Sequence, residues 1–302
     1  MNCLNCAKYL REAMDSVFAQ TYTDWEIIFW DNGSCDDSSS IAKCYGERVR
    51  YFKSDQVHPL GKARNLALEK AHGKYIAFLD CDDIWMPTKL EKQIPILESN
   101  SKVGAVFSNA LYFADKGVSF RLYGKKKPPQ DQIFRELLTR DFLCMATVVI
   151  RKAGVLELGE WFDERFNIIE DGDLFLRLAY NWKFQYVDEV LTLYRIHNQS
   201  WTSSKKELLP REKEMMINKF CQLYPDFEYG FKDELETVNA KIQYQYALLD
   251  WERGNRGSVR RRLRPYLWKN KKYFAPYLLS AFPYLIYRGF LKTISKFARL
   301  RS

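Results

Sequence analysis

The sequence predicts an α/β fold in which helices flank a mostly parallel sheet, followed by a helical C-terminal region. Between residues 6 and 113, short apolar runs typical of buried strands alternate with segments whose apolar residues recur at helical spacing. From about residue 205 onward the spacing is helical. We therefore place one domain at residues 1–204 and a helical region at 205–302.

Each element follows from local spacing and from the residues that interrupt it. We expect helices at about 6–20, from "DDSSSIAKCYG" onward, at 60–73, at about 87–99 and at 168–180. We expect strands at 25–31, 49–54, 75–80, 103–113 and 146–152, with further extended pieces at "KFQYVDE" and 191–197. Ligands of such sheets bind beyond the carboxyl ends of the strands, where Asp31 and Asp80 lie.

The positive charge of the chain is concentrated near its C-terminus. Hydrophobic residues make up 47% and charged residues 28%, which excludes a disordered or collagen-like chain. The net charge is +9, but residues 251–302 hold 14 basic residues and one acid, and the remainder is slightly acidic. This local excess predicts an anionic partner such as a lipid surface. We expect no nucleic-acid partner, because no matching motif accompanies the charge.

The segment 269–302 mixes aromatic and aliphatic residues with Lys and Arg. Its uncharged stretch from Tyr273 to Tyr287 has 15 residues and contains Pro276 and Pro283, whereas a membrane-spanning helix needs about 20 apolar residues. We interpret it as an amphipathic segment that lies on an anionic membrane surface. The alternative is a helical hairpin packed on the first domain with a solvated basic face.

Seven cysteines lie at scattered positions, 3, 6, 35, 44, 81, 144 and 221. Their number is odd, and Cys3-x-x-Cys6 has no second pair to complete a zinc site. We therefore expect reduced thiols in a cytosolic setting. Since the N-terminal residues show no apolar signal segment, we expect a cytoplasmic protein that is peripheral on the inner face of the cell membrane if the basic region binds lipid.

The stretch "KYIAFLDCDDIW" places Asp80, Asp82 and Asp83 at the end of an apolar strand. Neighbouring carboxylates raise one another's pKa unless a cation neutralises them. Oxygen ligands suit Mg²⁺ or Mn²⁺, which commonly share their coordination with substrate phosphates. A metal site is one interpretation of this triplet, and a solvated turn with a helix cap is the other.

Other polar residues allow both a functional and an ordinary interpretation. Asp31 precedes the turn Asn32-Gly33-Ser34, which either approaches a nucleotide or is a common turn. Arg64 lies in the first turns of a helix whose amides favour phosphate, or it is a surface charge. The pair Glu170-Asp171 is either a helix cap or contains a partly buried general base. His197 is either structural or functional.

The order of these motifs resembles glycosyltransferase family 2, the inverting enzymes with the Rossmann-like GT-A fold. The matching stretches cover about residues 5–203: "NCAKYLREAMDSVFAQTYTDWEIIFWDNGSCDDS", "LGKARNLALEKAHGKYIAFLDCDDIWMPTKLEKQI", "FDERFNIIEDGDLFLRLA" and "YRIHNQSWT". Any one of these motifs is weak alone, whereas four in order are specific.

The resemblance implies a donor-binding role for five residues. Asn5 matches the Asn that follows the family's first strand. Asp31 would contact the nucleotide base, and Asn32 stands where the family's "DDGS" has a second Asp. Asp80 would face the ribose, and Arg64 would lie near the diphosphate of the donor.

The resemblance also implies the residues of the reaction centre. Asp82 would ligate Mn²⁺ or Mg²⁺, with Asp83 as a supporting neighbour. His197 matches the family's late His, which completes the metal shell or touches the diphosphate. Asp171 would be the catalytic base, and Glu170 would support it.

These roles imply a metal-dependent, inverting transfer of a sugar from a nucleotide sugar to a hydroxyl of a glycan or lipid-linked acceptor. We expect the donor to be a UDP-sugar and the reaction to belong to surface polysaccharide synthesis. One departure from the family is that its usual first strand is essentially absent, since only four residues precede Asn5. Either the natural protein is longer, or another strand fills the gap, or the protein is degenerate. The alternative function is therefore a non-catalytic module that binds sugar nucleotides or membranes.

Overall fold

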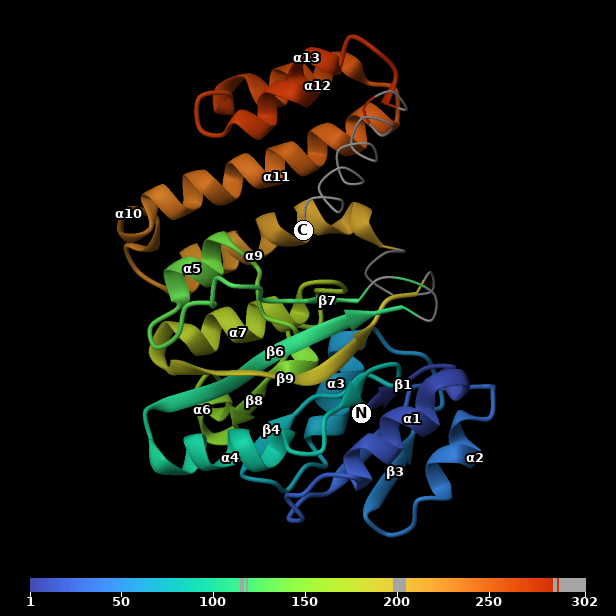
Figure 1. Cartoon of the computed structure of the whole chain (residues 1–302). Coiled ribbons are helices and arrows are strands. Elements are labelled where there is room, and N and C mark those ends of the chain that lie inside the picture. The colour runs from blue at the N-terminus through green and yellow to red at the C-terminus, as the bar shows by residue number, and fades with distance from the viewer. Residues whose placement is uncertain (115–116, 118, 198–204, 285–286, 288–302) are drawn as a thin grey trace. The chain divides into compact units, whose positions relative to one another are not determined.

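A computed structural model describes the chain except residues 115–116, 118, 198–204, 285–286 and 288–302 (Figure 1). The chain divides into two compact units, Met1–Ser204 and Lys205–Ser302. The first unit contains the sheets and the second is helical (Figure 1).

The strands of the first unit are short, apart from two long ones that form its centre. They are β1 Asn2–Cys3, β2 Ile27–Asp31, β3 Val49–Lys53, β4 Tyr75–Ala77, β5 Ile84–Trp85, β6 Val103–Phe113, β7 Phe120–Arg121, β8 Val149–Arg151 and β9 Lys183–Arg195. The first eight residues of β6 are all buried, because β6 pairs with β8 and β9 inside the unit.

Helices connect and cover these strands. They are α1 Ala7–Phe18, α2 Ser38–Lys43, α3 Leu60–Leu68, α4 Lys89–Ser99, α5 Phe134–Thr139, α6 Lys152–Leu156 and α7 Glu170–Asn181, with a 3₁₀ turn η1 at Met145–Thr147. The expected helix at 60–73 ends earlier, at Leu68, and the expected strand at 75–80 ends at Ala77.

Strand β2 shows how the sequence pattern builds the layers. Ile27 and Phe29 pack in one core cluster with residues of α1 and α2. The alternate residues Ile28 and Trp30 pack with Ala63 and Ala67 of α3. Because successive strand side chains point to opposite faces, helices cover both faces of this sheet.

Two sheets form, with strand orders β1-β2-β3 and β4-β8-β6-β9-β5, and β7 pairs with β6. The longest ladders are parallel, with ten residue pairs between β6 and β9 and five between β2 and β3. The antiparallel ladders of β4, β5, β7 and β8 have two or three pairs each. The predicted α/β class with a mostly parallel sheet and flanking helices is thus confirmed.

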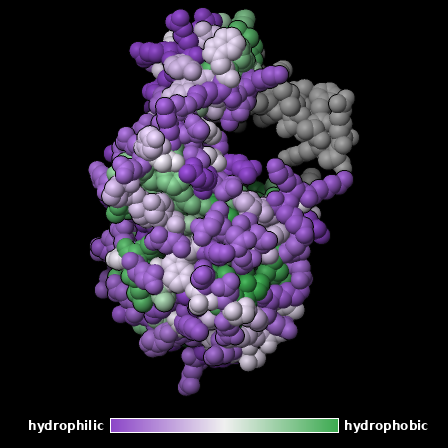
Figure 2. All heavy atoms as spheres, turned by 90° about the vertical axis from the view of Figure 1, so that its left-hand side faces the viewer, coloured by the Kyte–Doolittle hydropathy of each residue, from purple (hydrophilic) through white to green (hydrophobic). Residues whose placement is uncertain are grey.

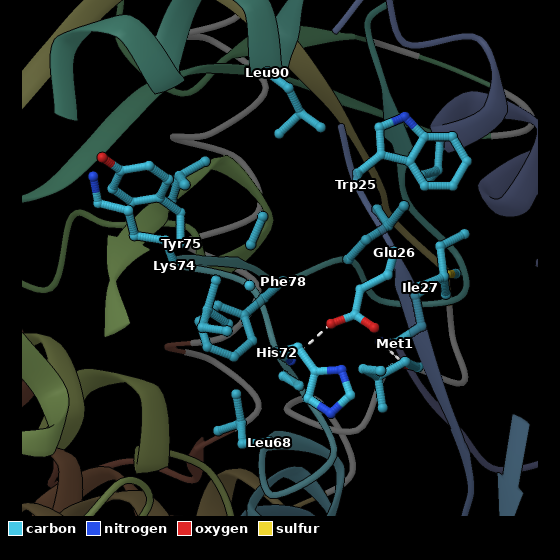
Figure 3. Close-up of a pocket in the computed structure, with 18 of the residues that line it drawn as sticks. Met1, Trp25, Glu26, Ile27, Leu68, His72, Lys74, Tyr75, Phe78 and Leu90 are labelled. Atoms are coloured by element: carbon cyan, nitrogen blue, oxygen red, sulfur yellow. Dashed lines mark hydrogen bonds between the residues drawn. The ribbon is translucent and has the colours of Figure 1, made fainter. Parts of the chain in front are cut away.

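The first strand is present but has only two residues. Strand β1 pairs in parallel with the last two residues of β2, Trp30 and Asp31. Beside the first residues of β2, Ile27 and Ile28, a cavity of ≈ 560 Å³ separates β2 from the segment that contains β4. Figure 3 shows Glu26 and Ile27 on one side of this cavity and Lys74 and Tyr75 on the other. Beside β1, Cys81 of the loop after β4 donates a hydrogen bond of 3.3 Å from its Sγ to the backbone oxygen of Asn2.

The second unit consists of η2 Lys206–Leu208, α9 Leu209–Leu223, α10 Phe227–Gly230, α11 Lys232–Glu252, α12 Arg256–Leu263, η3 Arg264–Tyr266, η4 Lys271–Tyr273 and α13 Phe274–Leu279. Its core contains Trp251 together with Tyr273 and Tyr287, so both ends of the uncharged stretch are buried within this unit. Residues 285–286 and 288–302 of the predicted membrane segment lie outside the described residues.

Some apolar side chains of the second unit remain exposed. Trp268 is 91% exposed, Leu278 62% and Phe282 52%. Figure 2 shows one face of the molecule, on which hydrophilic residues predominate and hydrophobic residues form small separate patches. Among the residues that the structure describes, no helix is both long and apolar enough to cross a membrane.

Candidate functional site

The loop that follows β4 carries Asp82, one of the two predicted metal ligands, and its neighbour Asp83. Asp83 is 1% exposed, and its Oδ1 accepts a hydrogen bond of 2.9 Å from the backbone N–H of Arg195 at the end of β9. Burial, with the nearby charges of Asp80 and Asp82, raises the pKa of Asp83 well above its usual range. Asp83 thus anchors the loop to the end of β9.

Asp82 meets His197 across the end of β9. The Nε2 atom of His197 lies 2.8 Å from Oδ2 of Asp82, and both side chains are partly buried. Burial and the charge of Asp80 raise the pKa of Asp82. The structure thus brings together the two predicted metal ligands, which lie 115 positions apart in the sequence.

Sequence reasoning missed Arg195, which holds the same loop. Its Nε donates a 3.0 Å hydrogen bond to the backbone oxygen of Asp82, and its guanidinium pairs with Glu12 of α1 at 2.5 Å. Arg195 lies two residues before His197, and both side chains contact the ring of Tyr9. That spacing was the available signal.

Arg64 of α3 connects the loop after β4 to the start of α7. The arginine is 6% exposed, and its guanidinium donates to Oδ1 of Asp80 at 3.2 Å and to Oε1 of Glu170. The Arg64 and Glu170 side chains are both almost fully buried, whereas Asp80 is about half exposed. Arg64 is thus a buried bridge between two carboxylates.

Asp171 lies beside this bridge at the first turn of α7. Its Oδ1 accepts a 2.8 Å hydrogen bond from the backbone N–H of Gly172. Burial, followed by the charge of Glu170, raises the pKa of Asp171 to about 8. A carboxylate with a pKa near the working pH is suited to accept a proton in a reaction.

The three other predicted donor-binding residues form a separate group around the turn after β2. Asp31 is fully buried and accepts hydrogen bonds from Ser34 N at 2.7 Å and from the hydroxyl of Tyr51 at 2.6 Å. Asn32 exchanges two hydrogen bonds with the backbone of His58. These contacts fix the turn in one conformation.

Asn5 fixes the same turn from the other side. It adopts a positive φ of 56°, a conformation that Asn tolerates better than most residues. Its backbone N–H donates to Ser34 Oγ at 3.0 Å, and its side-chain oxygen accepts from Cys35 N at 2.9 Å. Among the described residues, no hydrogen bond joins Asn5, Asp31 or Asn32 directly to Arg64.

The donor set of Asp82 and His197 fits a divalent cation such as Mn²⁺. A carboxylate oxygen and an imidazole nitrogen lie within 2.8 Å of each other, and both are common ligands of such ions. Burial beside Asp80 disfavours the negative charge of Asp82, and a bound cation would offset that cost. The residues present therefore suit the metal role that the sequence suggested.

Comparisons with known proteins identify the family. The family model for glycosyl transferase family 2 matches residues 1–158. An uncharacterized glycosyltransferase of Methanocaldococcus jannaschii is 32% identical over 200 residues, which cover 64% of this chain and 67% of that protein. The UDP-Glc:alpha-D-GlcNAc-diphosphoundecaprenol beta-1,3-glucosyltransferase WfaP of Escherichia coli is 30% identical over 214 residues, which cover 70% of this chain and 82% of that protein.

Solved structures agree with this fold. The complex of S. aureus TarS with UDP-GlcNAc superposes with a TM-score of 0.62 at 16% identity, covering 89% of this chain and 90% of that one. The mannosyltransferase PcManGT of Pyrobaculum calidifontis was solved with GDP-Man and Mn²⁺. Its TM-score is 0.57 at 15% identity, and the match covers 94% of this chain and 83% of that one. The fold is that of the GT-A glycosyltransferases, as predicted, and the chain belongs to glycosyl transferase family 2.

Proposed function

We propose that this glycosyltransferase is a metal-dependent, inverting enzyme that moves a sugar from a UDP-sugar to a hydroxyl of a glycan or lipid-linked acceptor, in the synthesis of a surface polysaccharide. The observation that carries the proposal is the bridge of Arg64 between Asp80 and Glu170, beside Asp171. The bridge connects the loop that holds the candidate metal ligand Asp82 to the helix that holds the candidate base.

Relatives support the choice of donor and acceptor. The name of WfaP states a UDP-linked glucose donor and a diphosphoundecaprenol acceptor, and the chain spans 82% of that protein. TarS has been solved with UDP-GlcNAc, and PcManGT with Mn²⁺. A UDP-sugar and a divalent cation are therefore the first ligands to test.

On the leaving-group side, the chain would hold the donor diphosphate near Asp80, Asp82 and His197. A divalent cation bound by Asp82 and His197 would stabilise the negative charge of the departing nucleoside diphosphate. The backbone and side chain of Arg195 hold the loop in place for this task. The guanidinium of Arg64 adds a fixed positive charge on the same side.

On the acceptor side, we assign the base role to Asp171. Its carboxylate would accept the proton of the acceptor hydroxyl while that oxygen attacks the anomeric carbon. The attack comes from the face opposite the departing diphosphate, so a single displacement inverts the configuration. The charge of Glu170 contributes to the raised pKa of Asp171 and so increases its basicity.

The test uses the full-length protein with Mn²⁺ and with UDP-glucose or UDP-N-acetylglucosamine as donors. Calorimetry measures donor binding, and release of UDP measures donor hydrolysis and transfer. We expect Asp171→Asn to retain binding and to lose about 10²–10⁴-fold in turnover. We expect Asp82→Asn to weaken donor binding only when Mn²⁺ is present.

Asp188→Asn is the matched control, because Asp188 is an exposed carboxylate of β9 that pairs with Lys127. Asp188→Asn should change neither donor binding nor turnover. Persistent turnover in Asp171→Asn would remove Asp171 from the base role. Donor binding without any turnover in the wild type would instead favour the non-catalytic module.

A further inference from the structure

Three cysteines that are distant in the sequence meet beside the loop after β4. Cys3 lies in β1, Cys6 immediately precedes α1, and Cys81 lies between Asp80 and Asp82. Their sulfur atoms all lie within 4.8 Å of one another. All seven cysteines are free thiols, so no disulfide occupies these sulfurs.

We propose that Cys3, Cys6 and Cys81 bind a thiophilic metal ion, Zn²⁺, as a trithiolate site. Tetrahedral Zn–S bonds of about 2.3 Å place the sulfurs about 3.8 Å apart. The observed upper limit of 4.8 Å therefore requires shifts of only about 1 Å. The proposal goes beyond the transfer reaction and does not depend on it.

The surroundings of the sulfurs suit this role. Cys3 and Cys81 are 1% and 2% exposed, whereas Cys6 is partly exposed and gives the ion a route of entry. Cys6 lies immediately before the 12-residue helix α1, which fixes its position beside Cys3 and Cys81.

The present contacts of the thiols are weak and replaceable. Cys6 donates to Leu4 O at 3.5 Å and Cys81 to Asn2 O at 3.3 Å. The sulfur of Cys3 lies 3.8 Å from Ser34 Oγ. Three thiolates fill three of the four positions of a tetrahedral ion, and that hydroxyl or a water molecule would take the fourth. A metal would replace these weak contacts of the thiols by three metal–thiolate bonds.

Ligand chemistry separates this site from the one at Asp82 and His197. Thiolates select Zn²⁺ or Cu⁺, whereas carboxylate oxygens suit Mn²⁺ and Mg²⁺. A zinc ion here would tie β1 and the start of α1 to the loop that carries Asp80 and Asp82. Such a link suits this chain, because β1 forms only two residue pairs with β2.

The test measures metal content without relying on activity. Full-length protein purified under reducing conditions is loaded with Zn²⁺, dialysed and analysed by mass spectrometry for metals, and its affinity is measured by competition with a chromophoric chelator. Co²⁺ substitution then reports thiolate ligands through their charge-transfer absorption in the near ultraviolet. We expect one Zn²⁺ per chain and a strong thiolate–cobalt band.

Three variants make the test specific. Cys6→Ser should lower the Zn²⁺ affinity at least about 100-fold, since even outer-shell changes cost 10–100-fold. Cys44→Ser, at an exposed cysteine of the same unit, and Asp82→Asn should leave the affinity unchanged. The proposal is overturned if the wild type holds no stoichiometric Zn²⁺, if the cobalt complex lacks thiolate bands, or if Cys6→Ser binds like the wild type.

Discussion

Replacement of Arg64 by Met removes the positive charge from the bridge between Glu170 and Asp80. The side chains of Arg64 and Glu170 are 7% and 4% exposed, whereas that of Asp80 is 43% exposed. Removing one partner of a buried ion pair costs about 3–5 kcal/mol, because the other charge stays buried. The half-exposed pair with Asp80 adds at most about 1 kcal/mol. The loss therefore comes mainly from Glu170.

The expected loss is large enough to measure by thermal unfolding. A cost of about 3–5 kcal/mol corresponds to a drop in Tm of roughly 6–20 °C for a unit of this size. Circular dichroism and tryptophan fluorescence should be followed together, because the chain has two compact units that can unfold separately. In the variant Arg64→Met, the transition of the mixed α/β unit, Met1–Ser204, should move to lower temperature, and that of the helical unit should not.

A double-mutant cycle separates the ion pair from simple loss of packing. Glu170→Gln in the Arg64→Met background should restore at least half of the lost stability, because the buried charge is gone. Arg11→Met, at an exposed position of α1, should change stability by less than about 0.5 kcal/mol. A loss below about 1 kcal/mol in Arg64→Met, or no recovery in the double variant, would refute the reasoning.

Two further predictions concern the candidate base and the second unit. If Asp171 is the base, kcat/KM should rise with pH through about 8, and Glu170→Gln should move this rise to lower pH. The pKa of Asp171, raised from 3.8 in the unfolded chain to about 8 in the folded protein, also means that its contribution to stability is lost progressively as pH rises from 3.8 to about 8, so a flat stability difference between wild type and Asp171→Asn across that range would contradict that pKa. If the second unit lies on anionic membranes, the paired change of Trp268 and Leu278 to Ser should lower binding to phosphatidylserine vesicles at least about tenfold in a flotation assay. Leu156→Ser, at an apolar side chain of the first unit with 59% exposure, is its control, and equal flotation of all variants would exclude this surface.

The sequence by itself determined the order of the elements and their approximate bounds. Hydrophobic spacing is a local property, so it identified α1, β2, β6 and α7 within a few residues. The expectation that the residues after β2 and β4 share one site came from the rule that ligands bind beyond the carboxyl ends of strands, and it stays a prediction, because the structure places β2 and β4 in different sheets. The match of four ordered motifs added Asp171 and His197.

Only the tertiary structure decided which distant side chains touch. Spacing indicated that Arg64 lies on a helix, but not that its guanidinium meets Glu170, 106 residues later. The pair Cys3 and Cys6 looked incomplete as a metal site, because the third sulfur of the cluster belongs to Cys81, which lies 75 residues after Cys6 in the sequence. Periodicity tells which face of an element is buried, and contacts between remote elements depend on how the whole chain packs.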